Sequence, residues 1–290
     1  MIPIQWFPGH MLETEQFLKK TISRVDVVLE VLDARLPVSS SNPLMDKLCH
    51  GVSRLKLLNK NDLADPDTTA SWIAHFRSGK GVDAIAITGT DEADVWRAAD
   101  QALKGLEKKP ARRARIMVVG IPNTGKSTIM NTLAGKKIAK TGNTPAITRH
   151  LQRATLKNHM DIYDTPGVLW PVFRDQTCAC RLAVSGAISD AAIDYNDIAC
   201  FFAAFLIDRY PHLLTLRYRL NEPVPREPVD LVEAIGIARG CIRKGGVVDF
   251  QKASGMLIRE FRDGKIGRIS LERPEDFTDT PEMELTSCID

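Results

Sequence analysis

Eight residues near the middle of the chain restrict its fold more than any other segment. The sequence Gly120-Ile-Pro-Asn-Thr-Gly-Lys-Ser127 follows an apolar run at 116–119 that predicts a strand, and it leads into a segment at 126–134 that predicts a helix. Glycines let backbone N–H groups turn inward around phosphate oxygens, and the N-terminus of the following helix adds positive potential. The pattern therefore predicts a phosphate-binding loop, in which Lys126 contacts the outer phosphates and Ser127 binds Mg²⁺.

A second motif, Asp164-Thr-Pro-Gly167, follows an expected strand at 160–163. A carboxylate at the end of this strand can hold Mg²⁺, and the glycine N–H can meet the terminal phosphate. The same four residues are also good turn formers, so the motif is weak by itself. Asp164 lies 38 residues after Lys126, with a pair of strands expected between them, and this spacing favours the functional interpretation.

A third motif, Asn59-Lys-Asn-Asp62, ends an expected strand at 55–58. The carboxylate of Asp62 can accept hydrogen bonds from the N1–H and N2–H₂ groups of guanine, whereas adenine has no such pair of donors. A polar turn containing Asn and Asp is the alternative. Beside the other two motifs, selection of GTP is the favoured interpretation.

The order of these motifs is unusual. GTPases usually carry the phosphate-binding loop first and N-K-x-D last, but here Asp62 precedes Gly120 by 58 residues. Either one motif is accidental or the domain is circularly permuted. Permutation is physically allowed because domain termini often lie close together, so the strand ends that carry the site need not move.

The pattern of expected elements predicts an α/β fold. Strands are expected at 25–32, 55–58, 84–87, 116–119, 151–156 and 160–163, and helices at 12–24, 91–108 and 126–134. We therefore expect a circularly permuted P-loop GTPase domain over 1–174, with a mainly parallel sheet and helices on both faces. A basic connector occupies 108–115. Helices at 197–210, 230–243 and 249–262 predict a small α-helical domain over 175–271, and 272–290 is expected to be an acidic, loosely ordered tail.

Composition limits the class of protein. The 290 residues are 44% hydrophobic and 26% charged, as in ordinary globular proteins. The longest apolar run, Ile198–Ile207, has ten residues, about half of what a membrane-spanning helix needs. Six cysteines without a CxxC pair indicate free thiols in a reducing cytosol. The net charge of +3 divides into −6 for 272–290 and +9 for the rest, which permits a polyanionic partner such as nucleic acid without requiring one.

Taken together, these segments resemble the circularly permuted GTPases, specifically the bacterial ribosome biogenesis GTPase A family. The segments that carry the resemblance beyond the three motifs include Phe7-Pro-Gly-His-Met11, Asp33-Ala-Arg-Leu-Pro37, Ser40-Ser-Asn-Pro43, Ile138-Ala-Lys-Thr-Gly142, Val168-Leu-Trp-Pro171 and Arg181-Leu-Ala-Val-Ser-Gly-Ala-Ile188. The resemblance implies a cytoplasmic GTPase that acts late in maturation of the large ribosomal subunit. It further implies a helical domain that contacts rRNA, a monomeric state, and no membrane or DNA partner.

The residues expected to bind the guanine nucleotide are Asn59, Lys60, Asn61, Asp62, Thr88, Gly89, Asn123, Thr124, Gly125, Lys126, Ser127, Thr128 and Gly167. Ser127, Thr148 and Asp164 are expected to bind Mg²⁺, with Thr144 as an alternative to Thr148. The family's P-G-x-T switch segment departs here to Pro145-Ala-Ile-Thr148, and alanine tolerates a positive φ poorly.

The hydrolytic site has an open position. Ras-like GTPases place a glutamine after D-x-x-G to orient the attacking water, and here Val168 stands there, so slow hydrolysis by the protein alone is expected. Three candidates could complete the site: His10, a K⁺ ion held by Asn123, or RNA itself. The expected catalytic residues are His10, Lys126 and Gly167.

Two other functions remain open from the sequence. The protein could be a nucleotide-gated rRNA-binding module in which hydrolysis is incidental, an alternative that Val168 favours. It could also be an ATP-dependent enzyme with a chance Asn59-Lys-Asn-Asp62 sequence.

Overall fold

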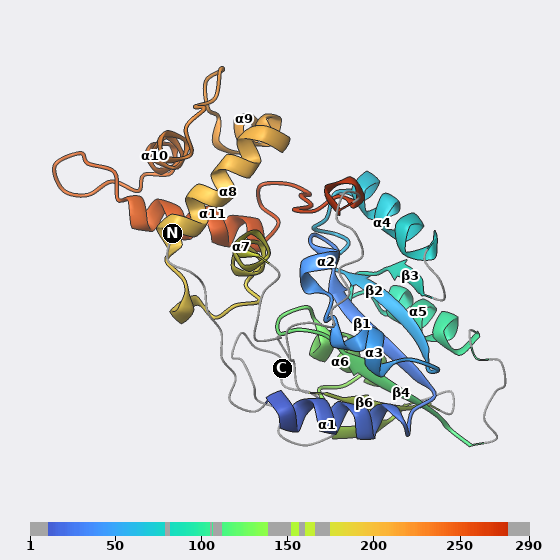
Figure 1. Ribbon diagram of the computed structural model, residues 1–290. Helices are drawn as coiled ribbons and strands as arrows, with labels where there is room; N and C mark the ends of the chain where they lie inside the picture. The colour runs from blue at the N-terminus through green and yellow to red at the C-terminus, as the bar shows by residue number, and fades with distance from the viewer. Residues whose placement is uncertain are drawn as a thin grey trace. The chain divides into compact units, whose positions relative to one another are not determined.

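The computed structural model describes residues 11–78, 82–104, 106, 112–138, 152–156, 160–165 and 175–277. The chain divides into two compact units, shown in Figure 1 and described separately below. Among the described residues, the sheet unit contains 11–165 and 272–277, and the helical unit contains 175–271. The helical unit is therefore an insertion, because the chain returns to the sheet unit after it.

The sheet unit is built on one six-stranded sheet with the order β3-β2-β1-β4-β6-β5. The strands are β1 (Val27–Asp33), β2 (Ser53–Asn59), β3 (Asp83–Ala86), β4 (Ala114–Val119), β5 (Gln152–Thr155) and β6 (Met160–Asp164). All neighbours are parallel except β5, which pairs antiparallel with β6. Parallel strands are covered on both faces, and β1 is accordingly buried at every position.

Helices cover both faces of this sheet (Figure 1). They are α1 (Met11–Ile22), α2 (Pro37–Ser40), α3 (Leu44–Leu48), α4 (Pro66–Ser78), α5 (Glu92–Lys104) and α6 (Lys126–Ala134). On one face, Leu29 of β1 belongs to an apolar cluster with residues of α5 and α6. On the other face, Val28 of β1 clusters with Leu18 of α1 and Met45 of α3. Successive side chains of a strand point to opposite faces, so one strand supplies both cores.

The helical unit packs around a central apolar helix. Its elements are α7 (Gln176–Ser185), the 3₁₀ turn η1 (Asp190–Ala192), α8 (Tyr195–Arg209), α9 (Pro211–Tyr218), α10 (Pro228–Ala238) and α11 (Phe250–Arg262). Phe202 of α8 is fully buried, and its ring lies 4.7 Å from that of Phe261 on α11. Within the described ranges, no single helix is long and apolar enough to span a membrane; α8 and α9 meet the criterion only as a pair, which is bent by 109°.

The predicted fold class is confirmed: a mainly parallel sheet with helices on both faces, and a helical part after it. The helices α2, α3, α4, α7 and α9 are additional to those expected. The helix expected over 230–243 ends at Ala238, because Gly240 adopts φ +67° and the chain then turns into a small bridge between Ile242 and Val248.

The expected basic connector and acidic tail differ in detail from the observed segments. The connector at 108–115 runs into β4, which begins at Ala114. Its arginines are paired in the sheet unit, Arg112 with Asp26 at 2.7 Å and Arg113 with Asp161 at 3.1 Å. These pairs reduce the free positive charge that the sequence suggested for a polyanionic partner.

The prediction of a loose tail from Glu272 is wrong for residues 272–277. Glu272 is fully buried, and its carboxylate accepts hydrogen bonds from the backbone N–H groups of Val38 and Ser39 and from the Ser39 hydroxyl. The first N–H groups of a helix have no partner within it, so a carboxylate from a distant segment can satisfy those of α2. The indole of Trp72 donates to the Glu272 carbonyl at 3.0 Å, and Phe277 in the 3₁₀ turn η2 (Pro274–Phe277) packs on Trp72.

The Glu272 contacts predict a measurable contribution to stability. Replacing Glu272 with Gln removes the charge from a buried acceptor and directs an amide toward N–H donors, so the free energy of unfolding should fall by about 1–3 kcal/mol. Urea unfolding would measure the loss. Glu275→Gln, at an exposed position of η2, is the control and should change stability by less than about 0.5 kcal/mol. Equal stability of the two variants would contradict the proposed role of Glu272.

Candidate nucleotide-binding site

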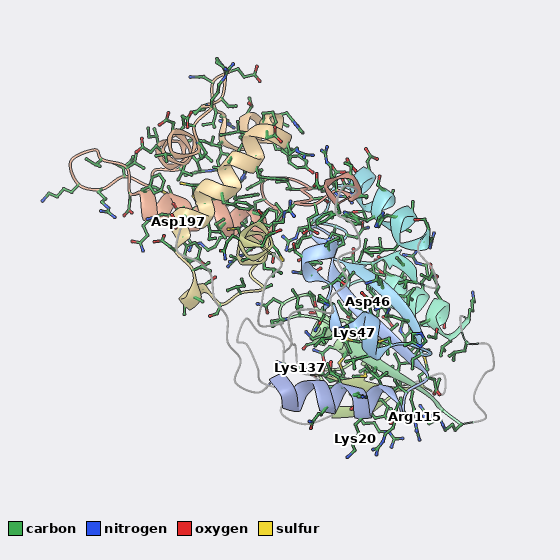
Figure 2. The ribbon with its side chains drawn as sticks, in the orientation of Figure 1. Lys20, Asp46, Lys47, Arg115, Lys137 and Asp197 are labelled. Atoms are coloured by element: carbon green, nitrogen blue, oxygen red, sulfur yellow. The ribbon has the colours of Figure 1, made fainter. Side chains whose placement is uncertain are left out.

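The expected nucleotide-binding segments follow the carboxyl ends of parallel strands in the same sheet. Asn59 ends β2, the loop 120–125 follows β4, and Asp164 ends β6. Parallel strands end at one edge of a sheet, which is where ligands of such sheets bind. At the opposite edge, where β4 begins, Arg115, labelled in Figure 2, donates from its guanidinium to the carbonyl of Arg24 at 3.2 Å. The topology thus gathers segments that are far apart in sequence.

The phosphate-binding loop requires glycine at two positions. A Cβ on Gly120 would lie 2.4 Å from the carbonyl oxygen of Val31, and one on Gly125 would lie 2.2 Å from Nδ2 of Asn59. Both glycines also have φ values, +151° and +97°, that side chains rarely adopt. The loop therefore passes against β1 and against the Asn59 side chain, and it delivers the chain into α6 at Lys126.

The side chain of Asn59 joins three of the predicted segments. Its Nδ2 donates to the carbonyl oxygen of Thr124 at 2.6 Å, and its Oδ1 accepts from the N–H of Gly89 at 2.8 Å. Thr132 of α6 reinforces the arrangement, because its hydroxyl donates to the Gly89 carbonyl at 2.8 Å. The N-K-N-D motif, the phosphate-binding loop and the loop at Thr88–Gly89 are therefore in direct contact, as a permuted GTP site requires.

The residues after Asn59 form a tight turn. Lys60 adopts φ +62°, and its Nζ donates to Oδ2 of Asp33 at 2.7 Å. The N–H of Asn61 donates to the carbonyl of Ile87 at 3.2 Å, which ties the motif to the end of β3. Asp62 is exposed, so its carboxylate is accessible to a ligand.

Lys126 and Asp164 form a buried pair of opposite charges at the phosphate end of the site. Burial lowers the pKa of Lys126 from 10.5 to about 8, although the charge of Asp164 acts in the other direction. Burial likewise raises the pKa of Asp164, and Lys126 partly opposes this shift. The Lys126 ammonium donates to the Ile121 carbonyl at 2.6 Å. Both charged forms would gain from a ligand that carries phosphate and a divalent cation.

The donor set fits Mg²⁺ bound together with phosphate. Ser127, at the start of α6, is half-buried and offers a hydroxyl, and Asp164 offers a buried carboxylate. Across the described ranges, no group of three or more His, Cys, Asp or Glu residues could hold a metal alone. Mg²⁺ typically takes only one or two protein ligands and completes its shell with phosphate and water, so a sparse donor set is appropriate.

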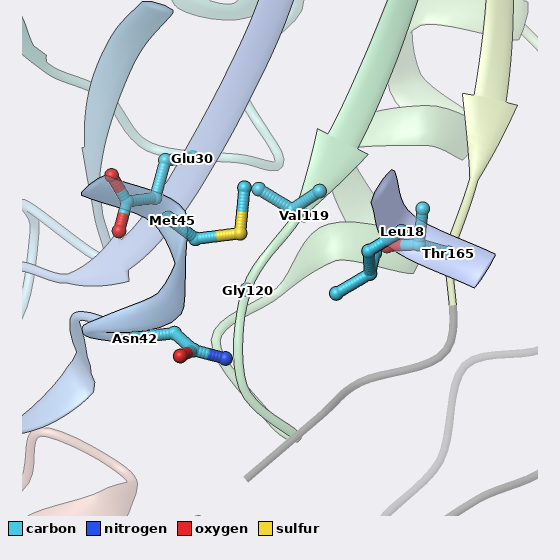
Figure 3. A pocket seen from close by; sticks show the side chains of 7 residues that line it. All are labelled: Leu18, Glu30, Asn42, Met45, Val119, Gly120 and Thr165. Carbon is cyan, nitrogen blue, oxygen red and sulfur yellow. The ribbon is translucent and has the colours of Figure 1, made fainter. Parts of the chain in front are cut away.

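A small cavity lies beside the start of the phosphate-binding loop. Figure 3 shows its lining: Leu18, Glu30, Asn42, Met45, Val119, Gly120 and Thr165. The Asn42 side chain extends toward the backbone that follows Gly120 (Figure 3). The Thr165 hydroxyl donates to the Val118 carbonyl at 2.7 Å, which fixes the start of the Asp164 loop against β4. The cavity therefore belongs to the support of the loop, between β4 and the helices α1 and α3.

Several predicted residues lie outside the described part of the chain, so their roles stay predictions. These are His10, Thr144, Thr148, Gly167 and Val168. Thr88 and Thr128 are described; the N–H of Thr88 donates to Asp94 at 3.0 Å, and Thr128 lies in the first turn of α6.

Three residues outside the sequence motifs also contact these segments, directly or through one another: Asp33, Arg35 and Thr132. Asp33 could have been found as a lone carboxylate at the end of an expected strand, whereas nothing in the sequence distinguishes Thr132.

The buried ammonium of Lys126 is expected to lower the stability of the nucleotide-free protein while it strengthens the binding of GTP. Its folded pKa lies below its unfolded value, so the unfolded chain binds the extra proton and stability rises as pH increases from about 8 toward 10.5. Lys126→Met should therefore make the nucleotide-free protein more stable at pH 7, remove this rise, and abolish tight GTP binding. Urea unfolding at pH 7 and pH 9.5, with nucleotide titration, would measure these effects. A variant that is less stable at pH 7 would contradict the expectation.

Comparisons with known proteins show which family this chain resembles. Residues 115–213 match the family model described as 50S ribosome-binding GTPase. Among solved structures, the GDP-bound structure of TM YlqF aligns with a TM-score of 0.66 and 30% identity, covering 90% of this chain and 100% of that one. The GNP-bound structure of YlqF from T. maritima aligns with a TM-score of 0.65 and 28% identity, covering 91% and 99%.

Curated relatives match over nearly their full length. Ribosome biogenesis GTPase A of Bacillus cereus is 43% identical over 283 residues, which cover 94% of this chain and 95% of that protein. Ribosome biogenesis GTPase A of Thermotoga maritima is 34% identical over 283 residues, which cover 95% and 96%. Family membership also removes the interpretation of Asn59-Lys-Asn-Asp62 as a chance sequence in an ATP-dependent enzyme. The protein belongs to the ribosome biogenesis GTPase A family.

Proposed function

We propose that this GTPase is a switch required for a late step in assembly of the large ribosomal subunit, with the precursor of that subunit and its rRNA as partners. The contact of Asn59 with both Thr124 and Gly89 carries the proposal, because it brings the segments expected to bind the base against the loop expected to bind the phosphates. The ribosomal assignment is supported by relatives named ribosome biogenesis GTPase A. We place this activity in the cytoplasm, in a monomer without membrane or DNA partners.

Guanine selection is assigned to the N-K-N-D turn. Asp62 would accept hydrogen bonds from N1–H and N2–H₂ of guanine, while Asn59 and Lys60 hold the turn against neighbouring loops. The backbone of Thr88 and Gly89 would border the base, since Gly89 is fixed by Asn59 on one side and by Thr132 on the other.

The phosphates are assigned to the loop that opens α6. The N–H groups of 123–128 would surround the phosphate oxygens, and Lys126 would exchange its bond to the Ile121 carbonyl for the outer phosphates. Ser127, Asp164 and Thr148, or Thr144 in place of Thr148, would hold Mg²⁺, which neutralises negative charge between the phosphates.

Hydrolysis is expected to be slow until the ribosomal particle completes the site. Val168 has no group that can orient water, and Gly167 would supply only an N–H to the terminal phosphate. His10, K⁺ bound by Asn123, and RNA are the three candidates for the missing contribution. A cation or an imidazole placed there would stabilise charge that develops in the transition state.

The helical unit is the proposed rRNA contact. The turn after α10 carries Arg239, Arg243 and Lys244 beside two glycines, which suits contact with phosphates. Two of these three side chains already have partners within the protein: Arg243 pairs with Asp249 at 2.9 Å, and Arg239 lies over the ring of Tyr218. Lys244, which is exposed, is the side chain of the three that we expect to bind RNA phosphate first.

Base recognition by Asp62 can be tested by changing the base. In Asp62→Asn, the amide can donate to the extra carbonyl of xanthine, but it no longer accepts two hydrogen bonds from guanine. GTP affinity should fall by about 10- to 100-fold and affinity for xanthosine triphosphate should rise. Equilibrium titration with labelled nucleotides would measure both. Asp67→Asn, at an exposed position of α4, should change neither affinity, and an unchanged preference in Asp62→Asn would remove Asp62 from the site.

The effect of large-subunit precursors on GTP hydrolysis distinguishes a GTPase switch from a nucleotide-gated rRNA-binding module. Single-turnover GTP hydrolysis should accelerate at least about tenfold when precursors of the large subunit are added, because they complete an unfinished site. Mature small subunits are the control and should give no acceleration. If large-subunit precursors bind only in the presence of GTP but leave the hydrolysis rate unchanged, the protein acts as a nucleotide-gated rRNA-binding module, which Val168 already favours.

A further inference from the structure

A buried carboxylate lies next to the base-reading turn without belonging to the motif. Asp33 ends β1 in direct register with Asn59, the last residue of β2, and the two strands pair in parallel. The N–H of Ala34 donates to the Asn59 carbonyl at 2.8 Å, so the chain after Asp33 runs against the start of N-K-N-D. Asp33 is only 3% exposed.

The Asp33 carboxylate contacts the side chains of two cations, Arg35 and Lys60, and the backbone N–H of Arg35. Its Oδ1 accepts from the N–H of Arg35 at 3.1 Å and from Nε of Arg35 at 2.9 Å. Its Oδ2 accepts from the Arg35 guanidinium at 2.8 Å and from Nζ of Lys60 at 2.7 Å. Arg35 therefore binds both carboxylate oxygens of Asp33, and Oδ2 also accepts a hydrogen bond from Lys60.

The charges of this cluster are maintained inside the protein. Burial by itself would raise the pKa of Asp33, but the nearby charges of Arg35 and Lys60 hold it well below its usual range. The side chain of Arg35 is 1% exposed and that of Lys60 is 23% exposed. A buried carboxylate that remains ionised constrains the positions of its partners, because loss of either contact would leave charge without compensation.

Lys60 has an unfavourable backbone conformation, so it needs contacts that hold it in place. With φ +62° it is one of three described residues other than glycine with positive φ. This conformation costs a non-glycine residue energy and persists only where surrounding contacts hold it. It also sets the direction in which the next residues, Asn61 and Asp62, leave the sheet.

We propose that Asp33 is a positioning residue for guanine recognition, in which its carboxylate, oriented by Arg35, holds Lys60 in the turn that presents Asp62 to the base. The proposal rests on the proposed role of Asp62. It assigns the pair Asp33–Arg35 a part in selecting the nucleotide, although neither residue touches the base.

The test uses a nucleotide that differs from GDP only in the contact to Asp62. Inosine diphosphate lacks the 2-amino group, so the ratio of GDP to IDP affinity reports one hydrogen bond to the Asp62 carboxylate. In Asp33→Asn, GDP affinity should fall about 5- to 30-fold, and the GDP/IDP ratio should move toward one because the turn no longer fixes Asp62. Titration of the full chain with both nucleotides would measure the ratio.

A matched control comes from another strand of the sheet. Asp161, near the start of β6, is 3% exposed and pairs with Arg153 at 2.8 Å, so Asp161→Asn makes the same chemical change in a buried ion pair, but away from Lys60. It should lower thermal stability and leave the GDP/IDP ratio unchanged. Arg35→Lys, which keeps the charge but loses the two-point grip, should lower the ratio to an intermediate value, and it carries the test if Asp33→Asn does not fold.

Coupling between Asp33 and Lys60 gives a second, independent readout. If Asp33 acts through Lys60, Lys60→Met should lower the ratio by itself, and adding Asp33→Asn to it should cause no further loss. Additive losses, or a ratio in Asp33→Asn equal to that of the original protein, would overturn the proposal. If Asp62→Asn also leaves base preference unchanged, the proposed role of Asp62 is wrong, and with it the basis for the role of Asp33. If Asp62→Asn alters base preference but Asp33→Asn does not, only the positioning role of Asp33 is wrong.

Discussion

The side-chain amide of Asn59 is the interaction on which the proposed nucleotide site depends. Its two ends bind the Thr124 carbonyl and the Gly89 N–H, so one side chain links the N-K-N-D turn to the phosphate-binding loop and to the loop at Gly89. The close approach is possible because Gly125 has no Cβ, which would otherwise lie 2.2 Å from Nδ2 of Asn59. An amide suits this position because it donates and accepts at once.

The permuted order is compatible with this contact because the sheet joins two halves of the site. Strands β1, β2 and β3 come first in the chain and carry the segments proposed to bind the base, whereas β4 and β6 follow and carry those proposed to bind the phosphates and Mg²⁺. The halves meet where β1 pairs in parallel with β4, from Val27 opposite Ile116 to Glu30 opposite Val119. A parallel sheet needs only that all these strands end at one edge, whatever their order in the chain. The Glu272 contacts bring the chain back to the half built on β1, β2 and β3, at α2.

The proposed site contains two sets of buried charges, which differ in how far the protein itself compensates them. Asp33, Arg35 and Lys60 compensate one another, so their charges are kept without a ligand. Lys126 and Asp164 are only partly compensated, as the lowered pKa of Lys126 and the raised pKa of Asp164 indicate. The first arrangement stabilises the architecture of the turn; the second costs stability that a bound phosphate and metal would restore.

The sequence by itself determined the fold class and the motifs, because Gly120–Ser127 and the strand-ending Asn59 and Asp164 carry chemistry in short local patterns. Local patterns could not show that Glu272 returns to cap α2, since an acidic, proline-containing end is also typical of a loose tail. Nor could they reveal the contact of Asp33 with Lys60, 27 positions apart, which exists only because β1 and β2 pair in register. Tertiary structure decided these contacts, since pairing between distant segments depends on how the strands align and not on the residues next to them in the chain.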